Sequence, residues 1–197
     1  MTSKTALITG ASSGIGEAFA EALAKEGSDL ILVARSKGKL EELAKKISAQ
    51  HGRRVEVIAL DLGEPSPGAR VAAAVAKLGM TVDLLVNNAG FGDTGAFVRQ
   101  TAQRSQQMMA LNCGAVVDLT HAFLPGMVER GSGGIINVAS LGAFQPLPYM
   151  AVYGATKAFV LSFSDAVWAE VRKKGIKVLA VCPGPVDTPF FTTSDSN

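Results

Sequence analysis

Tyr153 and Lys157 stand four positions apart in a segment whose apolar residues recur every three or four positions, as in a helix. Residues four apart lie on the same helix face, so the phenol and the amine can meet one substrate. Ser140 directly follows the apolar run Gly134–Ala139, where a predicted strand ends. Together these groups could pass a proton to a carbonyl oxygen while the carbonyl carbon receives a hydride.

This chemistry depends on the pKa of the tyrosine. An ordinary tyrosine has a pKa near 10 and exchanges protons too slowly at neutral pH. The ammonium group of Lys157 and a positively charged nicotinamide ring would both favour the phenolate. Lowering the pKa by about three units requires about 4 kcal/mol, which two charges in a dry crevice can supply. Each residue alone also has an ordinary interpretation: a packed aromatic, a solvated lysine or a serine that caps a strand.

A glycine-rich segment, residues 9–16, joins the first predicted strand to the first predicted helix. Backbone amides at a helix N-terminus bind phosphate groups, and glycines allow the close approach. The spacing GxxxGxG differs from the GxGxxG fingerprint, and no Gly-Lys-Ser/Thr follows as in a P-loop. We interpret the segment as a nucleotide-phosphate site; a tight turn without a ligand is the alternative. The predicted cofactor contacts are Gly10, Ser12, Ser13, Gly14, Ile15 and Gly16.

The end of the second predicted strand decides which dinucleotide fits. A carboxylate at this position binds the ribose 2′-hydroxyl of NAD. Here Ala34 is followed by Arg35, with Lys37 and Lys39 close behind, so a 2′-phosphate would meet cations. We therefore predict that NADP(H) is preferred and that NAD(H) can also be used. The alternative is a solvated basic loop that opens a helix.

Short β-branched runs alternate with longer segments of helical period, which is typical of a parallel sheet with crossover helices. Because crossovers are right-handed, we predict an α/β fold: a single-domain, Rossmann-type doubly wound sheet with strand order 3-2-1-4-5-6. Ligands would bind at the carboxyl ends of the strands. The predicted strands are Ala6–Thr9, Leu30–Ala34, Val55–Leu60, Leu84–Val86, Gly134–Ala139 and Lys177–Val181. The predicted helices are Gly16–Lys25, Lys39–Ala49, Pro67–Lys77, Gln103–Glu129 and Tyr149–Lys174.

Composition narrows the class of protein. The 197 residues suffice for one domain, 48% are hydrophobic, 18% are charged and the formal net charge is +2. This apolar content excludes disorder, and the small charge argues against a nucleic-acid partner. No apolar run reaches the roughly 18 residues of a membrane span. Cys113 and Cys182 lack metal-ligand spacing, so no metal site is expected; as small buried hydrophobes they fit a reducing, cytoplasmic location.

Five motifs in order make the chain resemble the short-chain dehydrogenases/reductases, in the branch that carries TGxxxGIG, NNAG, YxxxK and PG motifs. The similarity runs from Lys4 to about Thr188. Besides the glycine-rich turn, the motifs are Asn87–Gly90, Ser140, Tyr153–Lys157 and Pro183–Thr188.

The resemblance implies a role for each matched residue. Tyr153 would be the general acid/base, Lys157 would bind the nicotinamide ribose and lower the tyrosine pKa, and Ser140 would position the carbonyl. Asn112 would complete a catalytic tetrad by bending its helix and holding a water that links the lysine to solvent. Asp61 would bind adenine, unless it only caps its strand. The further implied cofactor contacts are Leu62, Asn88, Ala89, Gly90, Pro183, Gly184, Val186 and Thr188.

Two features depart from the family pattern. NADP-preferring relatives often carry a basic residue just before the second glycine of the turn, where this chain has Ser13, so the NADP(H) prediction depends on Arg35. Family members usually continue past the Thr188 region into a substrate-covering loop and a seventh strand, whereas this sequence ends at Asn197. We therefore expect either a truncated sequence or a shortened form of the protein, and in a shortened form the sixth strand would be an exposed edge unless a partner covers it.

The predicted function is an NADP(H)-dependent oxidoreductase that acts on a carbonyl or secondary alcohol. Phe91 and the segment Phe144–Tyr149 place apolar groups beside Ser140 and Tyr153, which favours a hydrophobic substrate; ordinary loop packing is the alternative. By the resemblance, an apolar stripe on Ala158–Val171 would form a homodimer or homotetramer. The competing interpretation is a non-catalytic nucleotide-binding regulatory or scaffolding protein. An epimerase or dehydratase of the extended branch would need a larger carboxyl-terminal domain.

Overall fold

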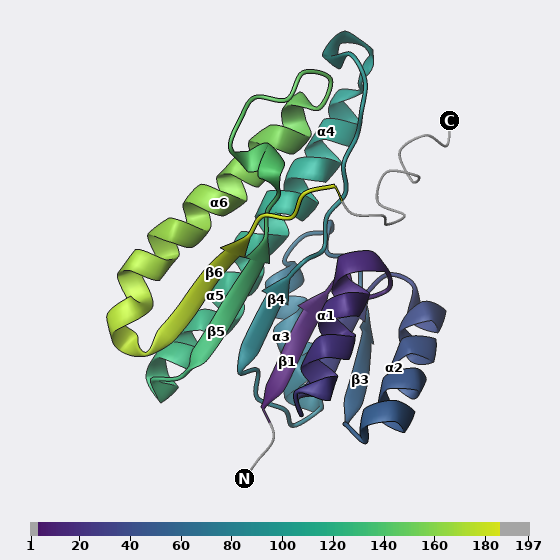
Figure 1. Cartoon of the computed structure of the whole chain (residues 1–197), viewed down its shortest axis with the longest axis vertical. Coiled ribbons are helices and arrows are strands. Elements are labelled where there is room, and N and C mark those ends of the chain that lie inside the picture. Colours follow the sequence, from purple (N-terminus) through teal and green to yellow (C-terminus); the bar gives the residue numbers. More distant parts are fainter. Residues whose placement is uncertain (1–3, 186–197) are drawn as a thin grey trace.

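Six short segments pair side by side as one parallel sheet in the computed structural model, which describes residues 4–185 (Figure 1). The strand order is β3-β2-β1-β4-β5-β6, which confirms the predicted topology. The strands are β1 (Thr5–Thr9), β2 (Asp29–Ala34), β3 (Val55–Ala59), β4 (Leu84–Asn87), β5 (Gly133–Val138) and β6 (Ile176–Val181). The helices are α1 (Gly14–Lys25), α2 (Lys37–His51), α3 (Pro67–Lys77), α4 (Ala102–Met109), α5 (Ala115–Arg130) and α6 (Ala151–Val171). Short turns are η1 (Phe97–Arg99), η2 (Ala110–Gly114), η3 (Leu141–Ala143) and η4 (Arg172–Lys174).

Helices cover both faces of the sheet because successive strand residues point to opposite sides. Leu7 and Leu85 belong to a core cluster shared with α3, α5 and α6. Ile8 and Leu32 face the other way, into a cluster with α1 and α2. Every residue of β1 is buried, as expected for a strand between two helix layers. This packing fixes the carboxyl ends of β1, β2, β4 and β5 at one edge, where the functional residues emerge.

The β6 edge of the sheet is covered on one face only, within the part of the chain that the structure describes. Val178 points toward the α3, α5 and α6 cluster and is 9% exposed, whereas its neighbour Leu179 is 55% exposed. β6 is the last strand in the sheet order. Among residues 4–185, β6 is therefore the outermost strand on its side of the sheet, and one of its faces is exposed.

Two predicted helices differ from the structure. The single helix expected over Gln103–Glu129 is interrupted by η2, a π-helical turn that separates α4 from α5. The helix expected over Tyr149–Lys174 begins later, because Tyr149 adopts a left-handed backbone conformation with φ 64°. The Tyr149 carbonyl accepts a hydrogen bond from the Gly95 amide (2.8 Å), which ties this turn to the loop after β4.

Further sequence predictions concerned membranes, metals and cysteines. None of the helices within residues 4–185 is long and apolar enough to cross a membrane. The same residues contain no group of His, Cys, Asp and Glu side chains suited to a metal ion. Cys113 and Cys182 are free thiols of intermediate burial, so both are less buried than the sequence predicted.

Candidate active site

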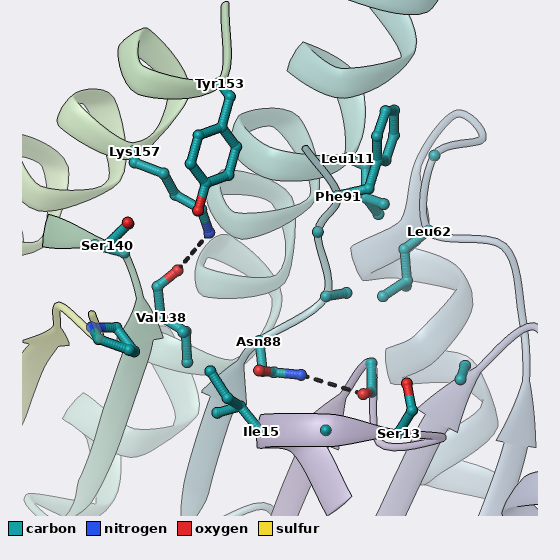
Figure 2. Close-up of a pocket in the computed structure, with 18 of the residues that line it drawn as sticks. Ser13, Ile15, Leu62, Asn88, Phe91, Leu111, Val138, Ser140, Tyr153 and Lys157 are labelled. Carbon is teal, nitrogen blue, oxygen red and sulfur yellow. Dashed lines mark hydrogen bonds between the residues drawn. The ribbon is translucent and has the colours of Figure 1, made fainter. Parts of the chain in front are cut away.

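A cavity of about 1010 Å³ opens at the carboxyl ends of β1, β2, β4 and β5 (Figure 2). Ligands of open parallel sheets bind at this position. Of the site residues predicted from sequence, those that line the cavity are Gly10, Ser12, Ser13, Gly14, Ile15, Arg35, Asp61, Leu62, Asn88, Ala89, Gly90, Ser140, Tyr153, Lys157, Pro183 and Gly184. Gly16 and Asn112 do not line it but support residues that do. Val186 and Thr188 lie outside the described residues.

The glycine-rich turn is held in a shape that only glycine fits. Gly10 has φ +64° and its amide donates a hydrogen bond to the Val33 carbonyl (2.8 Å), which carries the chain across the end of the sheet. A Cβ atom on Gly16 would collide with the Gly10 carbonyl oxygen and would lie 2.6 Å from the Asn88 Nδ2 atom. Helix α1 begins at Gly14 and Ser13 makes no side-chain capping bond, so the first turn of α1 faces the cavity without a capping side chain.

Thr9 links the turn to the strand beside it, a role that the sequence analysis missed. Its hydroxyl oxygen accepts hydrogen bonds from the backbone amides of Asn88 (2.9 Å) and Ala89 (3.0 Å), and it donates to the Val86 carbonyl (3.2 Å). The Asn88 side chain in turn donates to the carbonyls of Thr9 (2.9 Å) and Gly10 (3.2 Å). The ends of β1 and β4 are therefore one rigid unit. A threonine at the end of a buried strand was the available signal.

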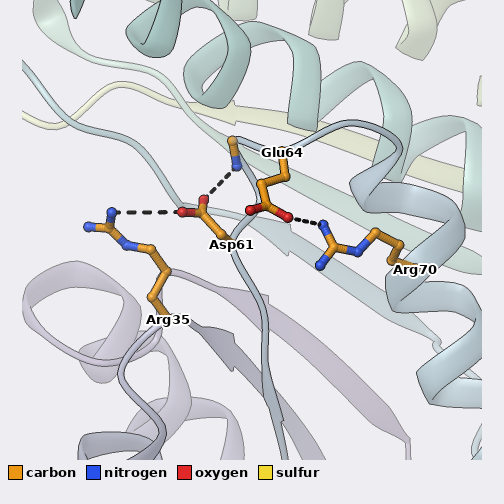
Figure 3. Close-up of polar contacts among 5 residues, drawn as sticks. Arg35, Asp61, Glu64 and Arg70 are labelled. Carbon is orange, nitrogen blue, oxygen red and sulfur yellow. Dashed lines mark hydrogen bonds and ion pairs between the residues drawn. The ribbon is translucent and has the colours of Figure 1, made fainter.

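Arg35 and Asp61 meet at the far end of the cavity (Figure 3). Arg35 Nη1 lies 3.9 Å from Asp61 Oδ2, and the two side chains are 80% and 43% exposed. An ion pair this long and exposed contributes little stability. The other Asp61 oxygen accepts a hydrogen bond from the Gly63 amide (2.8 Å), which fixes the carboxylate. Arg35 therefore remains available to an anionic ligand.

Ser140 and Tyr153 come from different elements and meet at one side of the cavity, beside Lys157 (Figure 2). Ser140 follows the β5 strand, and its Oγ atom accepts a hydrogen bond from the Gly142 amide (3.1 Å). Burial raises the pKa of the Tyr153 phenol above its ordinary value, while a hydrogen bond with Ser140 acts in the opposite direction. In the unliganded protein the tyrosine is therefore a weaker acid than free tyrosine.

Lys157 is buried at 5% exposure, which is rare for a lysine that has no carboxylate partner. Its Nζ atom donates a hydrogen bond to the Val138 carbonyl (2.8 Å) and lies 5.8 Å from the centroid of the Tyr153 ring. Burial lowers the pKa of the ammonium to about 8. At neutral pH the side chain is still mainly charged, so α6 holds a cation next to the tyrosine.

Asn112 occupies the π-helical turn between α4 and α5 and is 1% exposed. Its amide donates to the Phe91 carbonyl (2.9 Å) and the Thr156 hydroxyl (3.1 Å), and its oxygen accepts from the Phe91 amide (3.1 Å). A Cβ atom on Gly90 would lie 3.0 Å from the Asn112 oxygen and 3.8 Å from Lys157 Nζ. Asn112 thus ties the loop after β4 to α6. π-turns often occur at functional sites.

A buried chain of polar side chains fixes α6 to the sheet below the cavity. Asn87 Nδ2 donates to Asn137 Oδ1 (2.9 Å), and Asn137 Nδ2 donates to Ser164 Oγ (2.9 Å). Ser164 lies on the same helix as Tyr153. Asn87, Asn137 and Ser164 are each at most 3% exposed. Hydrogen bonds in this environment are costly to leave unmade, so the chain fixes the position of α6.

The apolar residues expected on the substrate side are only partly in the cavity. Gln145, Leu147 and Phe91 line it, together with Leu141 and Met150, which the sequence analysis did not select. Phe144 and Tyr149 do not line it and are 64% and 67% exposed. Phe91, Leu141, Leu147 and Met150 therefore form an apolar part of the cavity wall, beside the polar residues Arg104, Gln107 and Gln145.

Comparison with known proteins agrees with the fold and the motifs. A family model described as short chain dehydrogenase matches residues 4–197, so the chain belongs to the short-chain dehydrogenase family. Ketoacyl reductase HetN of Nostoc sp. is 35% identical over 192 residues, which cover 98% of this chain and 67% of that protein. The very-long-chain 3-oxoacyl-CoA reductase of Anas platyrhynchos is 38% identical over 194 residues, which cover 96% of this chain and 62% of that protein.

Solved structures extend the similarity to the whole sheet. A short-chain dehydrogenase from Sphingobium yanoikuyae in complex with NADPH has a TM-score of 0.92 and 40% identity, covering 98% of this chain and 75% of that one. L-sorbose reductase from Gluconobacter frateurii, complexed with NADPH and L-sorbose, has a TM-score of 0.90 and 40% identity, covering 96% and 72%. The chain spans about two thirds of the two curated relatives above and 32% of the oxidoreductase EphD of Mycobacterium tuberculosis.

Proposed function

We propose that the protein transfers a hydride between NADP(H) and a carbonyl or secondary alcohol, with Tyr153 as the general acid and base. One observation carries this proposal: Tyr153, Ser140 and Lys157 line the same cavity as the glycine-rich turn. Family membership supports the oxidoreductase class. Two similar solved structures, from Sphingobium yanoikuyae and Gluconobacter frateurii, contain NADPH and support the cofactor.

The residues present fit a dinucleotide. Gly10 has a positive φ, and there is no space for a Cβ atom at Gly16. Because these two positions carry no side chain, the backbone amides of the turn can approach a pyrophosphate closely. Arg35 and Lys39 supply cations at the other end of the cavity for a 2′-phosphate. Asn88, Ala89 and Gly90 would line the adenosine side. When bound, NADP(H) supplies or accepts the hydride.

The protein residues then manage the proton. Ser140 would donate a hydrogen bond to the substrate oxygen and hold it beside the Tyr153 phenol, which donates the proton during reduction. Burial raises the pKa of Tyr153, so the active phenol needs positive charge nearby. Lys157, held by the Val138 carbonyl, supplies one such charge and would also bind the ribose hydroxyls. Asn112 would keep Lys157 in place through Thr156 and the loop after β4.

We expect Arg35→Asp to reverse the preference for cofactor. The variant replaces a cation of the cavity wall with a charge that repels a 2′-phosphate and accepts hydrogen bonds from a ribose 2′-hydroxyl. Wild-type kcat/KM should favour NADPH over NADH by at least about tenfold, and the variant should favour NADH. Lys45→Asp is the matched control, because Lys45 is exposed on α2 and does not line the cavity. Equal use of both cofactors, unchanged in Arg35→Asp, would exclude the preference.

The substrate class is proposed from the apolar wall formed by Phe91, Leu141, Leu147 and Met150. Burial of such a wall against a substrate favours ketones with hydrophobic substituents. Similar proteins include reductases of oxoacyl-CoA thioesters and of a ketose, so a panel should contain aryl ketones, alkanones, a 3-oxoacyl thioester and L-sorbose. We expect saturable NADPH oxidation with at least one apolar ketone.

That panel also separates an enzyme from a nucleotide-binding regulatory or scaffolding protein. NADPH binding measured by the change in its fluorescence, without oxidation by any carbonyl compound on the panel, would favour the non-catalytic alternative.

We also propose that the protein is cytoplasmic and forms a homo-oligomer. The support for an oligomer is Phe159 on α6, which is 43% exposed and stacks on Phe163 one turn further along the helix (ring centroids 5.9 Å).

A further inference from the structure

Arg104 is a charged residue of the cavity wall that the proposed chemistry does not use. It lies on α4, it is half-buried, and it lines the same cavity as Tyr153. Its guanidinium carbon lies 4.0 Å from the centroid of the Phe91 ring. An arginine stacked on an aromatic face is held in place while its N–H donors remain free to bind at the edges.

No carboxylate pairs with Arg104 among the described residues. The two carboxylates in the cavity wall, Asp61 and Glu64, pair with Arg35 and Arg70 instead (Figure 3). The cavity wall therefore holds more cations than it can neutralise. A stacked guanidinium without an acidic partner is suited to a carboxylate or phosphate ligand, which it can bind through two parallel hydrogen bonds.

The anion that fits Arg104 belongs to the substrate and not to the dinucleotide. Under the proposed function, the pyrophosphate is matched by the turn before α1 and the 2′-phosphate by Arg35 at the end of β2. Arg104 reaches the cavity from α4, and Phe91 beneath it lies across the drawn pocket from Ser140 and Tyr153 (Figure 2). We propose that Arg104 binds an oxyanion at the far end of an oxo substrate with an apolar body. This inference rests on the proposed function.

The place of Arg104 in the cavity wall bears on the length of that substrate. Arg104 stacks on Phe91, and the backbone of Phe91 is hydrogen-bonded to the Asn112 side chain. Asn112 contacts Thr156, which follows Tyr153 by three residues on α6. Because Phe91 lies across the pocket from Ser140 and Tyr153, we expect a chain of several carbon atoms between the reacting carbonyl and the anionic group (Figure 2). A medium-chain oxo acid has this separation, whereas a short oxo acid does not.

The test compares 9-oxodecanoate with its methyl ester, which has the same carbonyl and chain but no charge. We expect the wild-type kcat/KM for the acid to exceed that for the ester by at least about fivefold. Arg104→Gln should remove this preference by lowering the value for the acid and leaving that for the ester unchanged. Arg104→Lys should retain part of it. Arg99→Gln, at an exposed arginine outside the cavity, is the matched control.

Further substrates define the anion and the distance. Wild-type preference for 9-oxodecyl phosphate over the neutral ester, but not for the acid, would assign the site to phosphate. No charge preference is expected with 5-oxohexanoate and its ester. Equal kcat/KM for the C10 acid and ester in the wild type would overturn the inference, as would a loss in Arg104→Gln confined to KM for NADPH. Turnover of other ketones with neither C10 compound would overturn it and leave the proposed function intact, whereas no turnover of any carbonyl would contradict the proposed function itself.

Discussion

Tyr153→Phe should lower kcat for ketone reduction about a thousandfold while the protein still binds NADPH. The substitution removes only the hydroxyl that donates the proton, and positioned general acids contribute roughly 10²–10⁴ in rate. Because the ring remains, the packing of α6 and the position of Lys157 should be kept. Steady-state NADPH oxidation gives kcat, and a fluorescence titration gives the dissociation constant of NADPH, which should change by less than about twofold.

Tyr149→Phe is a matched control for this prediction, because the chain has only two tyrosines. Tyr149 lies just before α6, is 67% exposed and does not line the cavity. Its contact with Gly95 uses the backbone carbonyl, which the substitution leaves in place. We expect this variant to retain wild-type kcat. If Tyr153→Phe also retained wild-type kcat, Tyr153 would not be the proton donor.

Lys157→Met should abolish activity and stabilise the unliganded protein. Burial lowers the pKa of Lys157 from its ordinary value of 10.5 to about 8, so the folded state holds this charge at a cost. The difference corresponds to about 3 kcal/mol at pH 7. Loss of the hydrogen bond to the Val138 carbonyl offsets about 1 kcal/mol. We therefore expect a gain of about 2 kcal/mol in unfolding free energy at pH 7, together with at least a hundredfold loss of kcat.

The pH dependence distinguishes this charge effect from a packing effect. Below pH 8 the lysine is protonated in both the folded and unfolded states, and the full cost is present. Between pH 8 and 10.5 only the unfolded state keeps the proton, so wild-type stability rises and the advantage of Lys157→Met should disappear. Urea unfolding at pH 7 and pH 10 measures this difference. Lys45→Met, at an exposed lysine of α2, should show no such change. A destabilised Lys157→Met at both pH values would contradict the charge argument.

Sheet topology could be predicted because its signals are local and repeated. Each buried strand is a continuous apolar run such as Leu30–Ala34, and each crossover helix has its own period. The predicted turn, tyrosine, lysine and serine come together at one edge because parallel strands all end there. Periodicity alone could not reveal the π-turn at Asn112, whose side chain makes hydrogen bonds to the backbone of Phe91, 21 positions earlier. The late start of α6 likewise depends on a tertiary hydrogen bond to Tyr149.

Residues that support the site were harder to predict than residues that face it. Thr9, Asn137 and Ser164 are read in sequence as ordinary members of a strand or helix, and only the fold shows that their hydrogen bonds connect separate elements. Arg104 gives no sequence signal either, since an arginine on an amphipathic helix is usually solvated. Its stacking on Phe91 and its place in the cavity wall appear only in three dimensions.

The acidity of Tyr153 in the complex with NADP⁺ can be measured directly by ultraviolet difference spectroscopy of the ionising phenol. With only two tyrosines in the chain, the Tyr149→Phe variant leaves Tyr153 as the sole phenol that can give the signal. We predict that its pKa is lower in the NADP⁺ complex than in the unliganded protein, where burial raises it, and that the signal moves to higher pH when NADP⁺ is omitted or Lys157 is replaced by Met. Ionisation of Tyr153 at the same pH with and without NADP⁺ would contradict the proposed acid–base role.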